Sequence, residues 1–184
     1  MAEHVCPWWI GYLLVSPLRR LGQDPRKILA PYLEPGMVVL DVGCGMGFFS
    51  LDMARLVGSE GKVVCVDLQE KMIRSLVRRA AKAGLLDRIE HRVCGRNSLG
   101  LEERSGKIDF ALAFAIVHEV PDAETFFKQI HAALRPGAAC LVAEPKGHVS
   151  EKRLEETIAT ARRAGFEPAG RPVIRRSRAA LLKR

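Results

Sequence analysis

The sequence predicts an α/β protein with a doubly wound, mostly parallel sheet of seven strands, helices on both faces and a C-terminal antiparallel hairpin. Three observations predict this class. Short apolar runs alternate with amphipathic segments of about 10–15 residues along most of the chain. The run at residues 38–42 ends in three glycines at alternate positions, Gly43, Gly45 and Gly47. Residues 166–184 alternate arginine with apolar side chains, as a charged strand at a sheet edge does.

The first half of the chain predicts a short helix and then two strand–helix pairs. Asp24 and Pro25 suit the N-cap and the first turn of the short helix. A turn at residues 34–36 and glycines at 58 and 84 delimit the later elements. We therefore expect a strand at 37–42, a helix at 48–57, a strand at 62–67 and a helix at 70–83.

The second half continues the alternation. Polar and apolar residues alternate in the strand at 88–94, whereas 108–115 is apolar except at Asp109 and is therefore expected to be a strand buried on both faces. Asp122 suits a helix N-cap with Thr125 in the following turn. The Arg135-Pro136-Gly137 segment predicts a sharp stop between helix and strand. We expect a helix at 122–134, a strand at 138–143, a helix at 150–164 and a terminal hairpin within 166–184.

Length and composition predict one ligand-binding domain at residues 36–184, preceded by an N-terminal helical extension at residues 1–35. The chain has 184 residues, of which 48% are hydrophobic, a content typical of globular proteins. No apolar run approaches the roughly 18–20 residues of a membrane span, and the start of the chain lacks a basic secretory signal. We therefore expect cytoplasmic residence and no transmembrane segment.

Cysteine usage and charge exclude further classes. The five cysteines are an odd number without a Cys-x-x-Cys pair, so we expect free thiols and no metal site. Residues 151–184 hold most of the net charge of +8. A solvated helix face and a charged edge hairpin account for that excess, and RNA contact is the alternative.

The glycine loop predicts a ligand that lies against bare backbone N–H groups at a helix N-terminus. The dinucleotide fingerprint is Gly-x-Gly-x-x-Gly, whereas this loop is one residue shorter and follows Asp41. That acid would repel a pyrophosphate, but it is compatible with a zwitterionic, sulfonium-bearing ligand. The alternative is an ordinary strand–helix turn without a ligand.

The segment from Leu40 to Gly47 resembles the first motif of class I S-adenosylmethionine (SAM)-dependent methyltransferases. Similarity extends over residues 36–145, through Asp67, the segment 113–122 and the Pro-Gly junction at 134–138. The chain looks similar to the small ubiquinone-biosynthesis-like methyltransferases. The resemblance implies SAM as the cofactor, S-adenosylhomocysteine as its product and a small-molecule acceptor.

The resemblance also implies which residues hold the cofactor. Asp67 would accept hydrogen bonds from the ribose diol, with the N-cap of the next helix as its structural alternative. Gly95 or Arg96 stands where the family often has an adenine-binding Asp, and Asn97 or Ser98 could replace it. The expected cofactor residues are Asp41, Gly43, Cys44, Gly45, Gly47, Asp67, Leu68, Gly95, Arg96, Asn97, Ala113 and Phe114.

Catalysis and acceptor binding have fewer candidates. His118 follows the fourth strand and is either a general base or a structural histidine. Glu144 ends the fifth strand and is expected to contact the substrate. Trp8, Trp9 and Tyr12 would form a lid over the strand ends or, alternatively, pack as an amphipathic helix or lie on a membrane surface.

Several functional alternatives stay open. An RNA methyltransferase would use the basic C-terminal segment, and a SAM-binding protein without catalysis would keep only the cofactor site. An NAD-dependent oxidoreductase is disfavoured by the glycine spacing and by Asp41. A homodimer that covers an open acceptor site is a further expectation.

Overall fold

The computed structural model describes residues 15, 17–20 and 22–184. Trp8, Trp9 and Tyr12, the predicted lid residues, lie outside the described residues. The described chain forms two compact units, one ending at Cys94 and the other running from Gly95 to Arg184. Each unit is described by itself.

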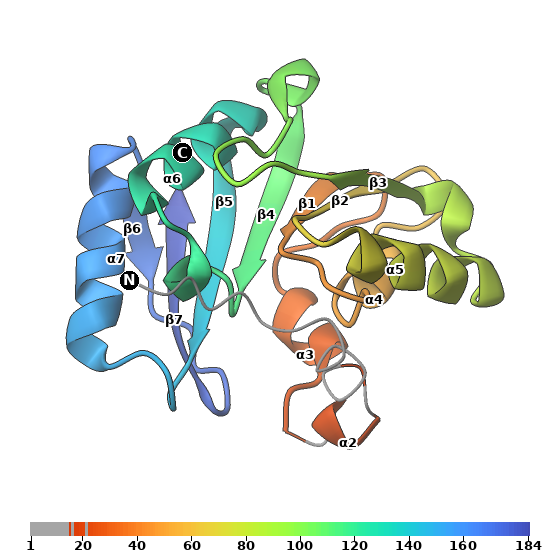
Figure 1. Ribbon diagram of the computed structural model, residues 1–184, viewed down its shortest axis with the longest axis horizontal. Coiled ribbons are helices and arrows are strands. Elements are labelled where there is room, and N and C mark those ends of the chain that lie inside the picture. Colours follow the sequence, from red (N-terminus) through yellow and green to blue (C-terminus); the bar gives the residue numbers. More distant parts are fainter. Residues whose placement is uncertain (1–14, 16, 21) are drawn as a thin grey trace. The chain divides into compact units, whose positions relative to one another are not determined.

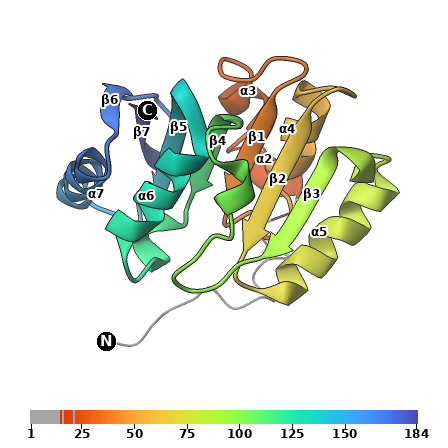
Figure 2. The same cartoon turned by 90° about the horizontal axis from the view of Figure 1, so that it is seen from above.

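The first unit is built on three parallel strands (Figure 1). β1 (Val38–Val42) and β3 (Ile89–Val93) both pair with β2 (Lys62–Asp67), which is buried along almost its whole length. Helix α5 (Glu70–Lys82) runs along β3 at the edge of these strands (Figure 2). The remaining helices are α2 (Pro17–Arg20), α3 (Pro25–Leu29), α4 (Ser50–Leu56) and the single turn η1 (Leu86–Arg88).

Two helix starts in this unit show how local chemistry sets the boundaries. Asp24 caps α3 as predicted, because its side chain accepts a hydrogen bond of 3.0 Å from the backbone N–H of Arg26. Helix α4 begins at Ser50, two residues later than the predicted start at 48. Phe48 and Phe49 belong to the turn that follows the glycine loop, where their buried rings pack edge to face.

The second unit contributes four strands. β4 (Ile108–Phe114) pairs in parallel with β5 (Leu134–Pro145), and β7 (Ser177–Lys183) lies antiparallel between β5 and β6 (Glu167–Gly170). The strand order is β3-β2-β1 within the first unit and β4-β5-β7-β6 within the second. The predicted class, a mostly parallel seven-stranded sheet with a C-terminal antiparallel hairpin, is confirmed. Helices α6 (Ala123–Ala133) and α7 (Glu151–Arg163) pack side by side, and the single turns η2 (Glu102–Arg104) and η3 (Val117–Glu119) flank β4.

The predicted stop at residues 135–137 is only partly correct. The helix does end before these residues, but β5 begins at once at Leu134 and is 12 residues long. The extra residues form a bulge, because Ile108 pairs with Leu134 whereas Phe110 pairs with Ala139. Gly137 adopts a φ of 78° and donates a hydrogen bond of 3.0 Å to the carbonyl of Arg184, so the bulge is tied to the end of the chain.

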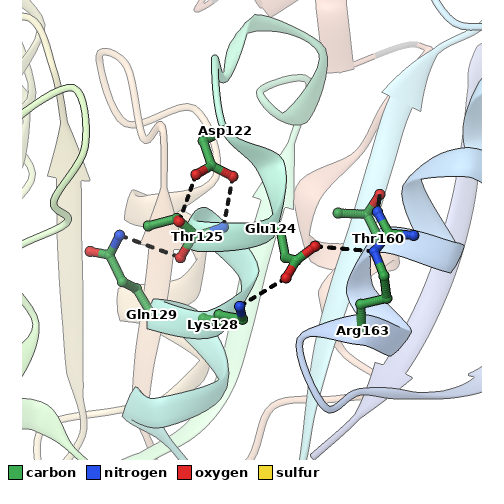
Figure 3. A network of polar contacts seen from close by, with 7 residues as sticks. All are labelled: Asp122, Glu124, Thr125, Lys128, Gln129, Thr160 and Arg163. Carbon is green, nitrogen blue, oxygen red and sulfur yellow. Dashed lines mark hydrogen bonds and ion pairs between the residues drawn. The ribbon is translucent and has the colours of Figure 1, made fainter.

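Helix α6 is capped at its start and is connected to α7 by polar contacts (Figure 3). Asp122 accepts from the backbone N–H of Thr125 at 3.0 Å and from its hydroxyl at 2.7 Å, which confirms the predicted N-cap. Glu124 accepts from Lys128 at 2.8 Å and from Arg163 of α7 at 3.1 Å. The contact with Arg163 is the one of these that joins the two helices, and it is exposed.

Across residues 15, 17–20 and 22–184, no helix is both long and apolar enough to cross a bilayer.

Candidate functional site

The glycine loop connects β1 to α4 and needs glycine for its backbone conformation. Gly43, Gly45 and Gly47 have φ values of 69°, 54° and 81°, in the left-handed region that other residues rarely adopt. The N–H groups of Gly43 and Cys44 both donate to the carbonyl of Val66, at 2.9 and 3.2 Å. The loop is therefore held against the carboxyl end of β2.

Two of these glycines differ in what surrounds them. A Cβ at Gly47 would lie 2.3 Å from Cδ1 of the buried Leu76, so close packing against α5 excludes a side chain there. A Cβ at Gly45 would meet no atom within 4 Å. The left-handed φ of Gly45 is reason enough for glycine there, and the open space beside it leaves room for a ligand to approach the backbone.

Asp67 ends β2 and is hydrogen-bonded to the glycine loop. Its Oδ2 accepts from the N–H of Gly45 and its Oδ1 from the N–H of Gln69, each at 2.8 Å. Gln69, and not Asp67, occupies the N-cap of α5, so the structural alternative for Asp67 is wrong. A carboxylate has about four acceptor positions, so two remain for a ligand. Burial raises the pKa of Asp67, and Leu68 beside it is half-buried.

Asp41 lies beneath the loop. Its carboxylate is 2% exposed, and Oδ2 accepts a hydrogen bond of 2.5 Å from the hydroxyl of Ser50, the first residue of α4. Burial raises the pKa of Asp41 to about 7, and the nearby Asp67 adds to that rise. Asp41 therefore links strand and helix from inside the unit. Cys44 is also buried, and burial together with Cys65 raises the pKa of its thiol.

Arginines of the N-terminal segment contact α4 and the turn before it, and sequence reasoning missed this. The guanidinium carbon of Arg19 lies 4.2 Å from the ring centroid of Phe48. Arg20 donates to the buried carboxylate of Asp52 at 2.5 Å, and Arg55 contacts the same carboxylate at 3.1 Å. The available sequence signal was an acid among the apolar residues of the predicted helix at 48–57, since an acid is rarely buried without a partner.

The second unit holds the remaining predicted cofactor residues. Gly95, Arg96 and Asn97 are exposed in the loop after β3. Gln129 of α6 holds this loop, because it donates to the carbonyl of Asn97 at 3.1 Å and accepts from the N–H of Leu99 at 2.7 Å. Ala113 and Phe114 are buried at the end of β4, opposite Val142 and Ala143 of β5.

The chain turns sharply directly after β4. Ala115 has a φ of 57°, one of two positive values among the described non-glycine residues, and such strain persists only where the surroundings hold it. Its N–H donates to the carbonyl of Ala143 at 2.7 Å. The next two N–H groups, of Ile116 and Val117, donate to Oε1 of Glu144 at 3.2 and 2.8 Å.

His118 follows this turn and is paired with the same carboxylate. Its Nδ1 is hydrogen-bonded to Oε2 of Glu144, whose side chain is only 1% exposed. The imidazole itself is 20% exposed. The hydrogen bond that the imidazole makes to Glu144 raises the pKa of His118, and this effect outweighs that of burial. Glu144, predicted as a substrate contact, is therefore buried and hydrogen-bonded to the histidine.

A second histidine adjoins this pair and was also missed by sequence reasoning. The ring of His148 lies edge to face with the ring of His118, with 5.6 Å between their centroids. Oε1 of Glu119 is 3.8 Å from Nε2 of His118, too far for a hydrogen bond. The only sequence signal for a role of His148 was that it is a polar residue in the segment after β5.

Known proteins resemble the chain in sequence. The profile of a family described as a methyltransferase domain matches residues 33–167. The ubiquinone biosynthesis O-methyltransferase of Caulobacter vibrioides is 34% identical over 137 residues, 74% of this chain and 51% of that protein. Its mitochondrial counterpart in Homo sapiens is 33% identical over 148 residues, 73% of this chain and 39% of that protein. The chain thus spans about half the length, or less, of these curated relatives.

Solved structures share the fold. A SAM-dependent methyltransferase from Aquifex aeolicus matches with a TM-score of 0.85 at 24% identity, covering 97% of this chain and 98% of its own. A SAM-dependent O-methyltransferase from Thermotoga maritima matches with a TM-score of 0.68 at 19% identity, covering 88% of this chain and 64% of its own. At these identities the likeness extends to the fold alone.

Proposed function

The chain belongs to the methyltransferase-domain family whose profile it matches, and from this premise we propose that it transfers a methyl group from SAM to a small-molecule acceptor. The observation that carries the proposal is the glycine loop bound to Asp67. Three left-handed glycines and a carboxylate with spare acceptor positions meet at the carboxyl ends of β1 and β2, where ligands bind in open α/β sheets.

The residues around Gly45 fit such a cofactor. The open space over Gly45 allows a ligand to approach the backbone, and Asp67 can accept hydrogen bonds from a ribose diol. We propose that Gly43, Cys44 and Leu68 complete the contacts of this unit. Asp41 supports the loop indirectly, because its buried carboxylate accepts a hydrogen bond from Ser50 at the start of α4. Gly95, Arg96, Asn97, Ala113 and Phe114 stay proposed cofactor residues of the second unit.

Bound SAM would supply a methyl group already activated by its sulfonium, so the protein has mainly to align the acceptor and exclude water. An acceptor hydroxyl must also lose a proton. We propose that His118 is the general base, since its pKa is raised from 6.5 and its ring is partly exposed. The sequence relatives are O-methyltransferases by name, which supports a hydroxyl acceptor.

RNA is the less favoured acceptor, because three of the ten basic side chains in residues 151–184 are already in ion pairs. Arg163 contacts Glu124, Arg171 contacts Glu155, and Arg178 contacts Glu151. A guanidinium group held by a carboxylate is less available to a phosphate. Cytoplasmic residence and a homodimer remain proposals from the sequence.

Calorimetry with S-adenosylhomocysteine tests the cofactor assignment. We expect the wild-type protein to bind it and not to bind NAD. Gly45→Ala should raise its Kd at least tenfold, because the new Cβ occupies the space the ligand needs. Gly84→Ala is the matched control, since Gly84 also has a positive φ, of 66°, and also faces open space, but at the end of α5.

Asp67→Ala should weaken binding by about 1–3 kcal/mol through the lost charged hydrogen bonds. Equal Kd values for the Gly45 and Gly84 variants would refute the loop assignment. Binding of NAD in place of S-adenosylhomocysteine would refute the proposed function itself.

A further inference from the structure

Both carboxylate oxygens of Glu144 are hydrogen-bonded to one turn of the chain. It is 1% exposed, and its Oε1 accepts the N–H groups of Ile116 and Val117. Oε2 is then the oxygen that meets Nδ1 of His118. Neither oxygen faces solvent, so Glu144 acts on the imidazole and on the backbone that carries it.

This arrangement determines which imidazole nitrogen carries a hydrogen. A carboxylate accepts hydrogen bonds and cannot donate them. Nδ1 of His118 must therefore be the protonated nitrogen in the neutral ring, and Nε2 carries the lone pair. The backbone at Ala115 is strained, and the turn that carries His118 is held in place by Glu144 and by Ala143. These contacts fix the position of the imidazole.

We propose that Glu144 is a positioning residue that holds His118 in the tautomer whose Nε2 takes the proton of the methyl acceptor. The proposal rests on the proposed function and adds to it the residue that orients the base. In the reaction an oxygen–carbon bond forms, the carbon–sulfur bond breaks with its electron pair left on sulfur, and the hydroxyl proton passes to Nε2.

The charged and titratable groups that face His118 come from several elements. Glu144 lies on β5, Glu119 on the same turn as His118, His148 after β5 and Arg153 on α7. Glu119 raises the pKa of His118 and Arg153 lowers it, but Glu144 has the largest effect. Only Glu144 is hydrogen-bonded to the ring among these groups.

Glu144→Gln is the informative variant, because it has nearly the same shape and reverses the hydrogen bond. The backbone N–H groups of Ile116 and Val117 need an acceptor, so the carbonyl of the introduced glutamine must face them. Its NH₂ group then donates to Nδ1 of His118. The hydrogen moves to Nε2, and the lone pair required of a general base is lost.

The test is nitrogen-15 NMR of the histidine side chains in the intact protein without added cofactor. We expect the wild-type His118 to be protonated at Nδ1 when neutral and to titrate above 6.5, the ordinary pKa of histidine. In Glu144→Gln the hydrogen should be on Nε2 and the pKa should fall. Glu119→Gln is the matched control, which removes a nearby carboxylate but should leave the Nδ1 tautomer in place.

Kinetics and binding complete the test. Glu144→Gln should lower kcat/KM at least tenfold, within the range by which general bases accelerate proton transfer, while the Kd for S-adenosylhomocysteine stays within twofold. An unchanged tautomer in Glu144→Gln, or a changed tautomer with unchanged kcat/KM, would overturn the proposal. If Glu144→Gln does not fold, an Nε2-protonated ring in the wild-type protein overturns it equally.

These outcomes separate the two proposals. Failure of the wild-type protein to bind S-adenosylhomocysteine would remove the proposed function. The NMR result would still show whether Glu144 sets the tautomer of His118.

Discussion

Replacing Asp41 with asparagine should remove a pH dependence from the stability of the fold. The carboxylate is 2% exposed beneath the glycine loop, and burial raises its pKa from 3.8 to about 7. Because the folded-state pKa is raised, this group favours folding fully below the unfolded value near 4. That contribution is lost as the pH rises through about 7.

The size of the effect follows from the shift. A rise of about three units, at about 1.36 kcal/mol per unit, is about 4 kcal/mol over the whole range. About 2–3 kcal/mol of this loss in unfolding free energy falls between pH 5 and pH 8. Asp41→Asn keeps a carbonyl oxygen for the hydroxyl of Ser50 and cannot ionise, so it should not show this loss.

Urea denaturation of both proteins at pH 5 and pH 8 measures the difference. The wild-type protein should lose about 2–3 kcal/mol more of its unfolding free energy than Asp41→Asn between the two pH values. Asp67 also has a raised pKa, but it is present in both proteins, so its own contribution largely cancels. The same pH dependence in both proteins would refute this account of Asp41.

Three further substitutions test the packing and the ion pairs. Gly47→Ala should lower the free energy of unfolding by about 2–4 kcal/mol, because its Cβ would collide with Leu76 at a positive φ; a loss below about 1 kcal/mol in urea denaturation would contradict the loop geometry. Asp52→Ala should cost about 1–3 kcal/mol, since it leaves Arg20 and Arg55 without their buried partner, and a Tm equal to that of the wild type would contradict it. Glu124→Ala removes two exposed ion pairs and should change the Tm only slightly, with no difference left in about 1 M NaCl; a large difference that persists in salt would contradict it.

Local signals explain why much of the fold could be predicted from the sequence. The strand predicted at 62–67 coincides with β2, because a run of β-branched residues is bounded there by glycine and a terminal acid. Asp24 and Asp122 cap helices as expected, since capping depends on neighbours within a few residues. The start of β5 was misplaced, because its bulge depends on pairing with β4.

The site depends on contacts between distant residues, and these set the limit of prediction. Glu144 was expected to face a substrate, but its orientation is decided by His118 and by two N–H groups 27 and 28 residues away. Asp52 pairs with Arg20 across 32 residues, and periodicity carries no signal for such a pair. The glycine loop is different, because its chemistry lies within consecutive residues and is visible in the sequence itself.

Backbone amide chemical-shift mapping with S-adenosylhomocysteine tests the central claim most directly. If the glycine loop and Asp67 hold the cofactor, the largest shifts in the first unit should fall on the amides of Gly43, Gly45, Gly47 and Gln69. Saturable shifts confined to other parts of the protein, or no shifts at millimolar ligand, would contradict the claim.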